Sequence, residues 1–371
     1  MGLAPDSASP EARREFVVMG ALACGAAVAI KAPEIFGLHL EHDGEFYARN
    51  VSLLVLPFLA GYFAWKRRLG PPTLALLAAA FAAPAAVVNA YPFDGGRDTS
   101  DTEVLAALHL PILLWLAVGL AHASGDWRSH DKRMDFVRFT GEWVIYFGLV
   151  ALGGGVLAGS TAGIFSAIGI DANEFIGLWL VPCGAAGAVV VAAWLAESRQ
   201  GVLERIAPVL TRLFTPLFTA MLAAFLVAVA LTGRGIDVGR GVLIFFDVLL
   251  ALVLALVIYS VAARDRHAPR GLFDLLLLLL VVAALLVDLL VLGAIVGRLS
   301  DFGATPNRIA ALGENLVLMG NLAWSAWLYL GFWRGRRGSA AIERWQTAYA
   351  PVYAIWLSAV VVAFPPLFGF A

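Results

Sequence analysis

The amino-acid sequence predicts an all-α protein, a polytopic bundle of about eleven transmembrane helices. Hydrophobic residues make up 61% of the 371 residues and charged residues only 14%, whereas about a quarter of a soluble domain is charged. The apolar residues recur in blocks of roughly twenty, the length of a helix that crosses a bilayer. We therefore predict one transmembrane helical domain over residues 13–371, after a disordered polar tail at residues 1–12.

The first five spans are bounded by charged or Pro/Gly-rich stretches. The first follows "EARR", the second ends at "KRR", and the third lies between "GPP" and the acidic "FDGGRDTSDTE". The fourth begins with "EVLAALHLPILLW", and the fifth begins at the end of "RMDFVRFTGEW". These boundaries predict spans at 14–31, 50–65, 72–92, 103–123 and 142–168.

The same punctuation predicts six further spans, at 174–196, 214–232, 241–263, 272–298, 309–333 and 346–367. Between two of them, the stretch "RQGVLERIAPVLTRL" at 199–213 is too charged to cross hydrocarbon. Its apolar residues nevertheless recur at helical spacing, which predicts a helix that lies in the membrane interface.

The basic residues of the loops predict the orientation of the chain. When alternate loops are counted together, one side of the membrane carries 19 Lys and Arg residues and the other carries 7. Cytoplasmic loops of inner-membrane proteins are enriched in Lys and Arg. The amino terminus is therefore predicted in the cytoplasm and the carboxyl terminus outside, with the lipid bilayer as the main partner.

Several other classes of protein find no support in the sequence. A net charge of −1 gives no reason to expect nucleic acid as a partner. Cys24 and Cys183 lie in apolar segments, without the C-x-x-C spacing of a metal motif. The sequence contains no P-loop, dinucleotide-binding or serine-hydrolase motif. We predict no metal, no cofactor and no catalytic residue.

An ionisable residue interrupts the most apolar span. Asp288 lies inside "LLLLLLVVAALLVDLLVLGAIVGR", where a carboxylate at the helix centre costs about 2.5–3.5 kcal/mol on insertion scales. At 1.5 Å per residue, Asp288 lies about 15 Å from the outer edge of its span. Asp247 lies about 10 Å deep, and Glu314 and His109 lie about 9 Å deep.

These four residues form a polar layer in the outer half of the predicted membrane, together with Asn89 and Asn315. In a functional interpretation, they line an outward-facing pocket that binds a proton, a cation or a small polar solute. In a structural interpretation, the carboxyl groups pair with Arg298, Arg308 or His109, or remain protonated, and only hold helices together. The sequence leaves both interpretations open.

Glycines are spaced for close helix packing in two spans. Gly155, Gly159 and Gly163 recur every four residues in the fifth span, and Gly293 and Gly297 repeat this spacing in the ninth. Small residues in such a pattern let two membrane helices approach closely. The adjacent glycines of "ALGGGV" would alternatively unwind the helix, as in transporters with broken helices. We prefer close packing.

The tenth span has a defined start. Thr305 before Pro306 is typical of an N-cap followed by proline in the first turn. Glu314 and Asn321 are seven residues apart and therefore share one face of the helix. Because a polar stripe on a membrane helix must face protein, we expect this face to point into the bundle.

Three stretches resemble segments of bacterial polytopic membrane proteins that are grouped under domains of unknown function. They are "RMDFVRFTGEW", "TPNRIAALGENLVL" and "WQTAYAPVYAIWLSAVVVAFPPLFGF". The likeness covers about the carboxyl-terminal two-thirds of the chain. It implies a location in the bacterial inner (plasma) membrane and no particular substrate.

Three hypotheses of function follow. The first is a transport-like or solute-binding protein with an outward-facing polar pocket, in which Asp288 and Glu314 bind a proton or a cation. The second is a non-catalytic membrane scaffold or envelope-assembly component. The third is a membrane-embedded enzyme that acts on a lipid, with an acid/base cluster drawn from "SHDKRMD" or "HLEHDGE". We favour the first; the sequence determines neither the transported species nor the oligomeric state.

Overall fold

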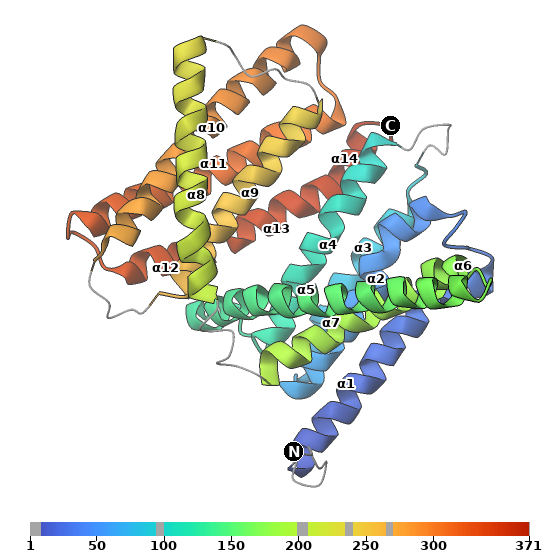
Figure 1. The fold of residues 1–371 in the computed structure, drawn as a ribbon. Coiled ribbons are helices and arrows are strands. Elements are labelled where there is room, and N and C mark those ends of the chain that lie inside the picture. The colour runs from blue at the N-terminus through green and yellow to red at the C-terminus, as the bar shows by residue number, and fades with distance from the viewer. Residues whose placement is uncertain (1–8, 94–99, 199–206, 234–239, 265–269, 371) are drawn as a thin grey trace. The chain divides into compact units, whose positions relative to one another are not determined.

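The computed structural model describes residues 9–93, 100–198, 207–233, 240–264 and 270–370 (Figure 1). These residues form helices and turns, and no strand occurs among them. Eleven helical segments of the described chain are long and apolar enough to cross a membrane. The predicted fold class, an all-α polytopic bundle, is confirmed.

Each of the eleven predicted spans coincides with one of these segments. The described part of the predicted tail is helical, because α1 (Pro10–Ala29) already begins at Pro10. Ser9 caps this helix, and its hydroxyl accepts the Ala12 N–H at 3.2 Å. Residues 1–8 lie outside the described residues. So do residues 199–206 of the predicted interfacial helix, and the remainder of that segment opens the long helix α8 (Ala207–Thr232).

The chain divides into two compact units, and each has a hydrophobic core of its own. The first unit comprises Met1–Ala90, Leu110–Trp127 and Phe139–Gln200. The second unit comprises Tyr91–His109, Arg128–Arg138 and Gly201–Ala371.

The first unit is built on its first and last helices. Its elements are α1, η2 (Ala32–Phe36), α2 (Gly44–Lys66), α3 (Pro71–Ala90), α6 (Asn173–Phe175), η3 (Ile176–Leu180) and α7 (Val181–Ser198), with parts of α4 (Asp101–His122) and α5 (His130–Ala167). A Cβ on Gly187 of α7 would lie 3.4 Å from the Ala23 backbone oxygen of α1. A Cβ on Gly25 would lie 2.6 Å from the ring of Phe58 in α2. Small residues thus let α1 pack closely against both α7 and α2.

The glycines predicted to pack lie on exposed faces instead. A Cβ on any of Gly155, Gly159, Gly163, Gly293 or Gly297 would meet no atom within 4 Å. These glycines therefore pack against no helix of the described chain. Most of the apolar stretch around the three glycines of α5 is exposed, so lipid rather than another helix of this chain can cover it. The helix continues through "ALGGGV" without unwinding.

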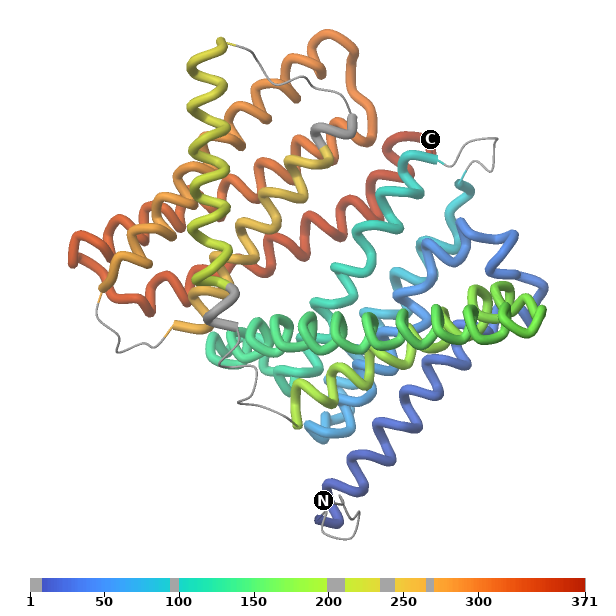
Figure 2. The backbone as a smooth tube through the Cα atoms, viewed as in Figure 1, coloured from blue at the N-terminus to red at the C-terminus, as the bar shows by residue number. Residues whose placement is uncertain are grey.

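The second unit is arranged around the long helix α10 (Leu272–Phe302). Its main elements are α8, α9 (Arg240–Ala262), α10, α11 (Pro306–Trp333), α12 (Ser339–Ala348), α13 (Ala350–Ser358), η4 (Ala359–Ala363) and α14 (Phe364–Leu367). α10 packs against α8, α9 and α11. The helical segments α13, η4 and α14 follow one another without a break in the chain (Figure 2). Buried apolar residues of α9 and α10 make up most of the main core cluster of this unit.

Helix α11 begins where the sequence predicts, and two of its glycines lie in close contact with aromatic side chains. The Thr305 hydroxyl accepts the Arg308 N–H at 3.4 Å, which confirms the predicted N-cap. A Cβ on Gly313 would lie 1.9 Å from the Trp356 ring, and one on Gly320 would lie 2.8 Å from the Tyr349 hydroxyl. These two glycines, seven residues apart, let α11 pack closely against the segment that contains α13.

Replacing Gly313 by alanine should therefore lower the thermal unfolding temperature of the purified protein in detergent. The Trp356 ring has to move, and overpacking of this kind costs about 1–3 kcal/mol. Gly297→Ala is the matched control, because its Cβ would meet no atom within 4 Å. An equal unfolding temperature for the two variants would contradict the close contact at Gly313.

Candidate functional site: a buried acidic cluster in the second unit

Three neighbouring helices of the second unit each contribute one carboxyl group to a shared region. Asp247 comes from α9, Asp288 from α10 and Glu314 from α11. Asp247 lies close enough to interact electrostatically with both of the others. We call these three residues, with their neighbours His109 and Asn315, the acidic cluster. The structure thus brings together five of the six residues of the predicted polar layer.

Asp288 is the most deeply buried member of the cluster. It has 0% of its surface exposed, and neither carboxyl oxygen accepts a hydrogen bond from the described residues. Asp288 therefore makes none of the pairings predicted for the carboxyl groups, and the Arg308 guanidinium donates instead to the carbonyls of Phe302 and Gly303 at 2.9 and 2.6 Å. The predicted pairing with His109 is made by Glu314. A buried carboxyl group without a donor is costly unless a proton or cation neutralises it.

Asn315 supplies donors to the cluster and leaves one further acceptor. Its Nδ2 donates to Asp247 Oδ1 at 2.7 Å and to the Ala311 carbonyl at 2.8 Å, so both N–H bonds are used. Its Oδ1 is buried and has no donor among the described residues. The cluster therefore has more buried acceptors than donors.

The His109–Glu314 contact holds a proton of its own. His109 Nδ1 lies 2.7 Å from the Leu105 carbonyl, and a carbonyl only accepts, so Nδ1 carries hydrogen. His109 Nε2 lies 2.6 Å from Glu314 Oε1. Two bare acceptors would repel at that distance, so one proton lies between them, on either the imidazole or the carboxyl group. The pair is then neutral overall, and it cannot neutralise Asp247 or Asp288.

The chemistry of the cluster suits a small positive ligand. Its free acceptors are carboxyl and amide oxygens, which bind protons and hard cations. Within the described ranges, no three His, Cys, Asp or Glu side chains converge as a metal-ion site does. Exposure rises from Asp288, which is fully buried, to Asp247 and Glu314, which are partly exposed. The partly exposed side is where a ligand would enter.

Asn89, the sixth predicted residue, is not part of this cluster. It belongs to the first unit, where it and Asn50 exchange amide hydrogen bonds of 2.7 and 3.0 Å. Asn89 Nδ2 also donates to the Ala85 carbonyl. This pair links α2 to α3, and we assign it a structural role.

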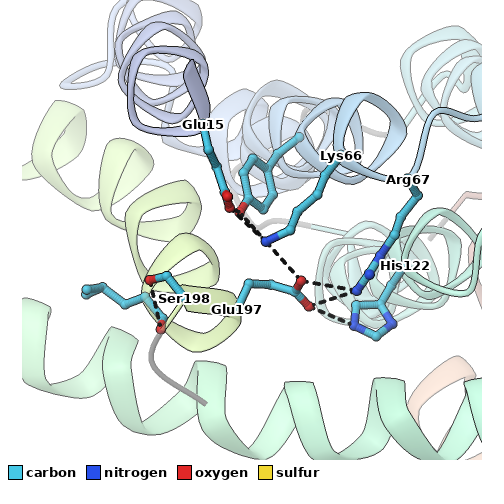
Figure 3. Close-up of polar contacts among 8 residues, drawn as sticks. Glu15, Lys66, Arg67, His122, Glu197 and Ser198 are labelled. Carbon is cyan, nitrogen blue, oxygen red and sulfur yellow. Dashed lines mark hydrogen bonds and ion pairs between the residues drawn. The ribbon is translucent and has the colours of Figure 1, made fainter. Parts of the chain in front are cut away.

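Sequence reasoning missed an ionic network in the first unit (Figure 3). Glu197 of α7 accepts from Arg67 at 3.1 Å and lies 3.1 Å from Lys66 and 3.3 Å from His122 Nε2. Glu15 of α1 accepts from Lys66 at 2.7 Å and from the Tyr62 hydroxyl at 2.6 Å, as the dashed lines in the figure show. The set joins α1, α2, α4 and α7.

The residues of this network lie near helix ends, where a charged residue in the sequence is taken to belong to a solvent-exposed loop. The sequence therefore does not predict the network. The available signal was that Glu15, Lys66, His122 and Glu197 all flank loops predicted on the same side of the membrane. Two carboxylates face one lysine and one arginine, so the charges balance. In contrast with the acidic cluster, this network is electrically satisfied and serves to hold helices together.

The two stretches considered for an enzyme make local contacts in the structure. "SHDKRMD" opens helix α5 rather than a solvated loop. There, His130 Nδ1 lies 2.7 Å from Arg133 Nη2 and 3.2 Å from the Thr347 hydroxyl. In "HLEHDGE", Asp43 accepts the His39 N–H at 2.7 Å. These contacts cap and pack local structure.

Comparison with known proteins finds no matching family model, no similar curated protein and no similar solved structure. The class of the protein therefore follows from its own structure. Eleven helical segments of the described chain are long and apolar enough to span a bilayer. The protein is therefore an integral, multi-pass membrane protein in contact with lipid.

Glu197→Gln tests the role of the ionic network. The change removes a charge that Arg67, Lys66 and His122 face, and hydrogen bonds to charged groups contribute about 1.5–3 kcal/mol each. We expect a loss of unfolding free energy of that size in a denaturant titration in mixed micelles. The control is Asp135→Asn, which breaks the exposed pair with Arg138 and should cost about 0–1 kcal/mol. Equal losses would show that the network is not a stabilising lock.

Proposed function

We propose that the acidic cluster binds a proton or a monovalent cation, and that the protein is a transport-like membrane protein. The observation that carries this proposal is the surplus of buried acceptors at Asp247, Asp288 and Asn315. Intramembrane ionisable residues are costly and typically mark ion or proton pathways. We further propose that the protein resides in the bacterial inner membrane with its amino terminus in the cytoplasm, on the strength of the Lys/Arg bias of its loops.

The charge of the cluster favours a ligand with a single positive charge. With the His109–Glu314 pair neutral, Asp247 and Asp288 carry the remaining negative charge. One proton or one monovalent cation between these two carboxyl groups removes their mutual repulsion, which is strong in a medium of low dielectric constant. Calcium needs six to eight oxygen ligands, and the described side chains offer no such set.

A membrane scaffold is the alternative. The ionic network of the first unit favours it, because that network shows that this chain uses buried charges to join helices. In a scaffold, the acidic cluster would be a second such contact. The unfavourable feature is Asp288, whose oxygens receive no donor from any described helix. The alternative predicts that stability does not depend on protons or cations through Asp288.

The experiment is a set of thermal unfolding curves of the purified protein in detergent, across pH and across NaCl and KCl concentrations. A ligand that binds only the folded state stabilises it by about 2.7 kcal/mol at a concentration one hundred times its Kd. We expect the wild-type unfolding temperature to rise as pH falls or as one of the two salts is added. Asp288→Asn should remove this response and leave expression intact. Glu314→Gln should weaken it.

Asp301→Asn is the matched control, since Asp301 is an exposed carboxyl group at the end of the same helix as Asp288. It should respond as the wild-type protein does. A response to pH and to both salts that is identical in wild type and Asp288→Asn would remove Asp288 from the mechanism and favour the scaffold.

A further inference from the structure

Buried polar side chains continue along α11 beyond the acidic cluster. Asn321, Ser325 and Tyr329 follow Glu314 at intervals of seven, four and four residues, so they share its face of the helix. Asn321 and Ser325 are 0% exposed and Tyr329 is 3% exposed. Apolar side chains would fill these positions at lower cost in a helix surrounded by hydrocarbon. The row therefore calls for an explanation other than packing.

The segment containing α12 adds a buried amide to the row. Gln346 Nε2 donates to Ser325 Oγ at 2.8 Å, and Ser325 Oγ lies 3.1 Å from Asn321 Oδ1. These three side chains form one connected group. Gln346 is 4% exposed, and its Oε1 has no donor among the described residues. This acceptor is a place for a water molecule or a mobile proton.

Two tyrosines lie beside the interval between Glu314 and Asn321. The Tyr349 hydroxyl donates to the Val317 carbonyl at 2.9 Å, which places it beside the middle of the interval. The Tyr353 ring lies 5.1 Å from the Tyr349 ring, measured between centroids. Its hydroxyl is close to the Asn321 amide, although the two do not have the geometry of a full hydrogen bond. Hydroxyl groups thus line this interval.

The row ends at a buried ion pair. Tyr329 interacts electrostatically with Asp274 and Arg264, which form an ion pair with each other. Asp274 is only 4% exposed and accepts the Gly271 N–H at 2.9 Å. From Glu314 to Tyr329 the row covers fifteen residues of α11, about 22 Å at 1.5 Å per residue. That is most of the roughly 30 Å of hydrocarbon.

We infer that this row is a proton path, which connects the acidic cluster with the Arg264–Asp274 pair through Tyr353, Asn321 and Ser325. The inference rests on the proposed function and specifies its ligand as the proton. The hydroxyl groups of Tyr353 and Ser325 can each accept a proton on one side and release their own on the other, so a proton crosses them with no net chemical change. The Asn321 amide positions this relay as a hydrogen-bond partner and does not itself exchange a proton. To pass from Ser325 to Tyr329, one helical turn away, the proposed path needs a bridging water molecule. A metal cation would need several oxygen ligands at each step, and this row offers one or two.

The test is proton flux into liposomes that contain the purified protein, driven by a potassium diffusion potential and read with an entrapped pH-sensitive dye. Wild-type protein should carry protons. Asn321→Leu and Ser325→Ala should lower the flux by about tenfold or more, because each removes a group on which the transfer barrier depends. Ser325→Thr retains the hydroxyl and should restore most of the flux.

Thr219→Val is the matched control for the loss of a buried hydroxyl. Thr219 lies in α8 of the same unit, and its hydroxyl donates to the Thr215 carbonyl at 2.7 Å. Its removal should leave the flux at the wild-type level. Wild-type flux in Asn321→Leu and Ser325→Ala, or an absence of flux in the wild-type protein, would overturn the path.

The same variants separate this inference from the proposed function. Asn321→Leu and Ser325→Ala should retain the dependence of the unfolding temperature on pH, since the acidic cluster is intact in both. Loss of flux with this dependence retained supports the path. If wild type and Asp288→Asn show the same dependence on pH, the proposed function fails and the path fails with it. If Asn321→Leu elutes as aggregate in size-exclusion chromatography, Ser325→Ala and Gln346→Leu decide the outcome.

Discussion

A carboxyl group inside a membrane bundle needs a positive counterpart, which is a cationic side chain, a bound cation or a proton. For Asp288 the described side chains provide none: it is fully buried and neither oxygen receives a hydrogen bond. The nearest ionisable groups are acidic, and the histidine of the cluster is engaged by Glu314. We therefore propose that the counterpart is a bound ligand. A proton or a monovalent cation meets this need with the least rearrangement, and the proposed function follows from it.

The two units treat buried charge in opposite ways. In the first unit, Glu197 faces arginine, lysine and histidine, and Glu15 faces lysine and a tyrosine hydroxyl. Both carboxylates of this network have donors, so the arrangement stabilises contacts between helices. In the second unit, both oxygens of Asp288 and the Oδ1 atom of Asn315 have no donor among the described residues. Unpaired buried acceptors lower stability unless they are neutralised, and for this reason we propose that the acidic cluster is a binding site.

Much of the fold was predictable from the sequence, because hydrocarbon thickness sets the length of an apolar helix and loops concentrate charge. Depth along a helix also placed Asp247, Asp288, Glu314 and His109 in one layer. Depth does not reveal which side chains are partners, and the structure pairs Asn89 with Asn50 of the first unit. The glycine spacing in α5 fitted a packing motif, but the close contacts are made by Gly187 and Gly313 instead. Spacing shows that a helix has a small face and does not show what covers it.

Infrared difference spectroscopy of the purified protein, recorded between two pH values, tests the central claim most directly. The claim is that the carboxyl groups of the acidic cluster exchange protons although Asp288 is sealed within the bundle. It predicts a carboxyl C=O band that changes between the two pH values in wild-type protein and in Asp301→Asn, and that is lost in Asp288→Asn. A difference spectrum of Asp288→Asn identical to that of the wild type would contradict the account.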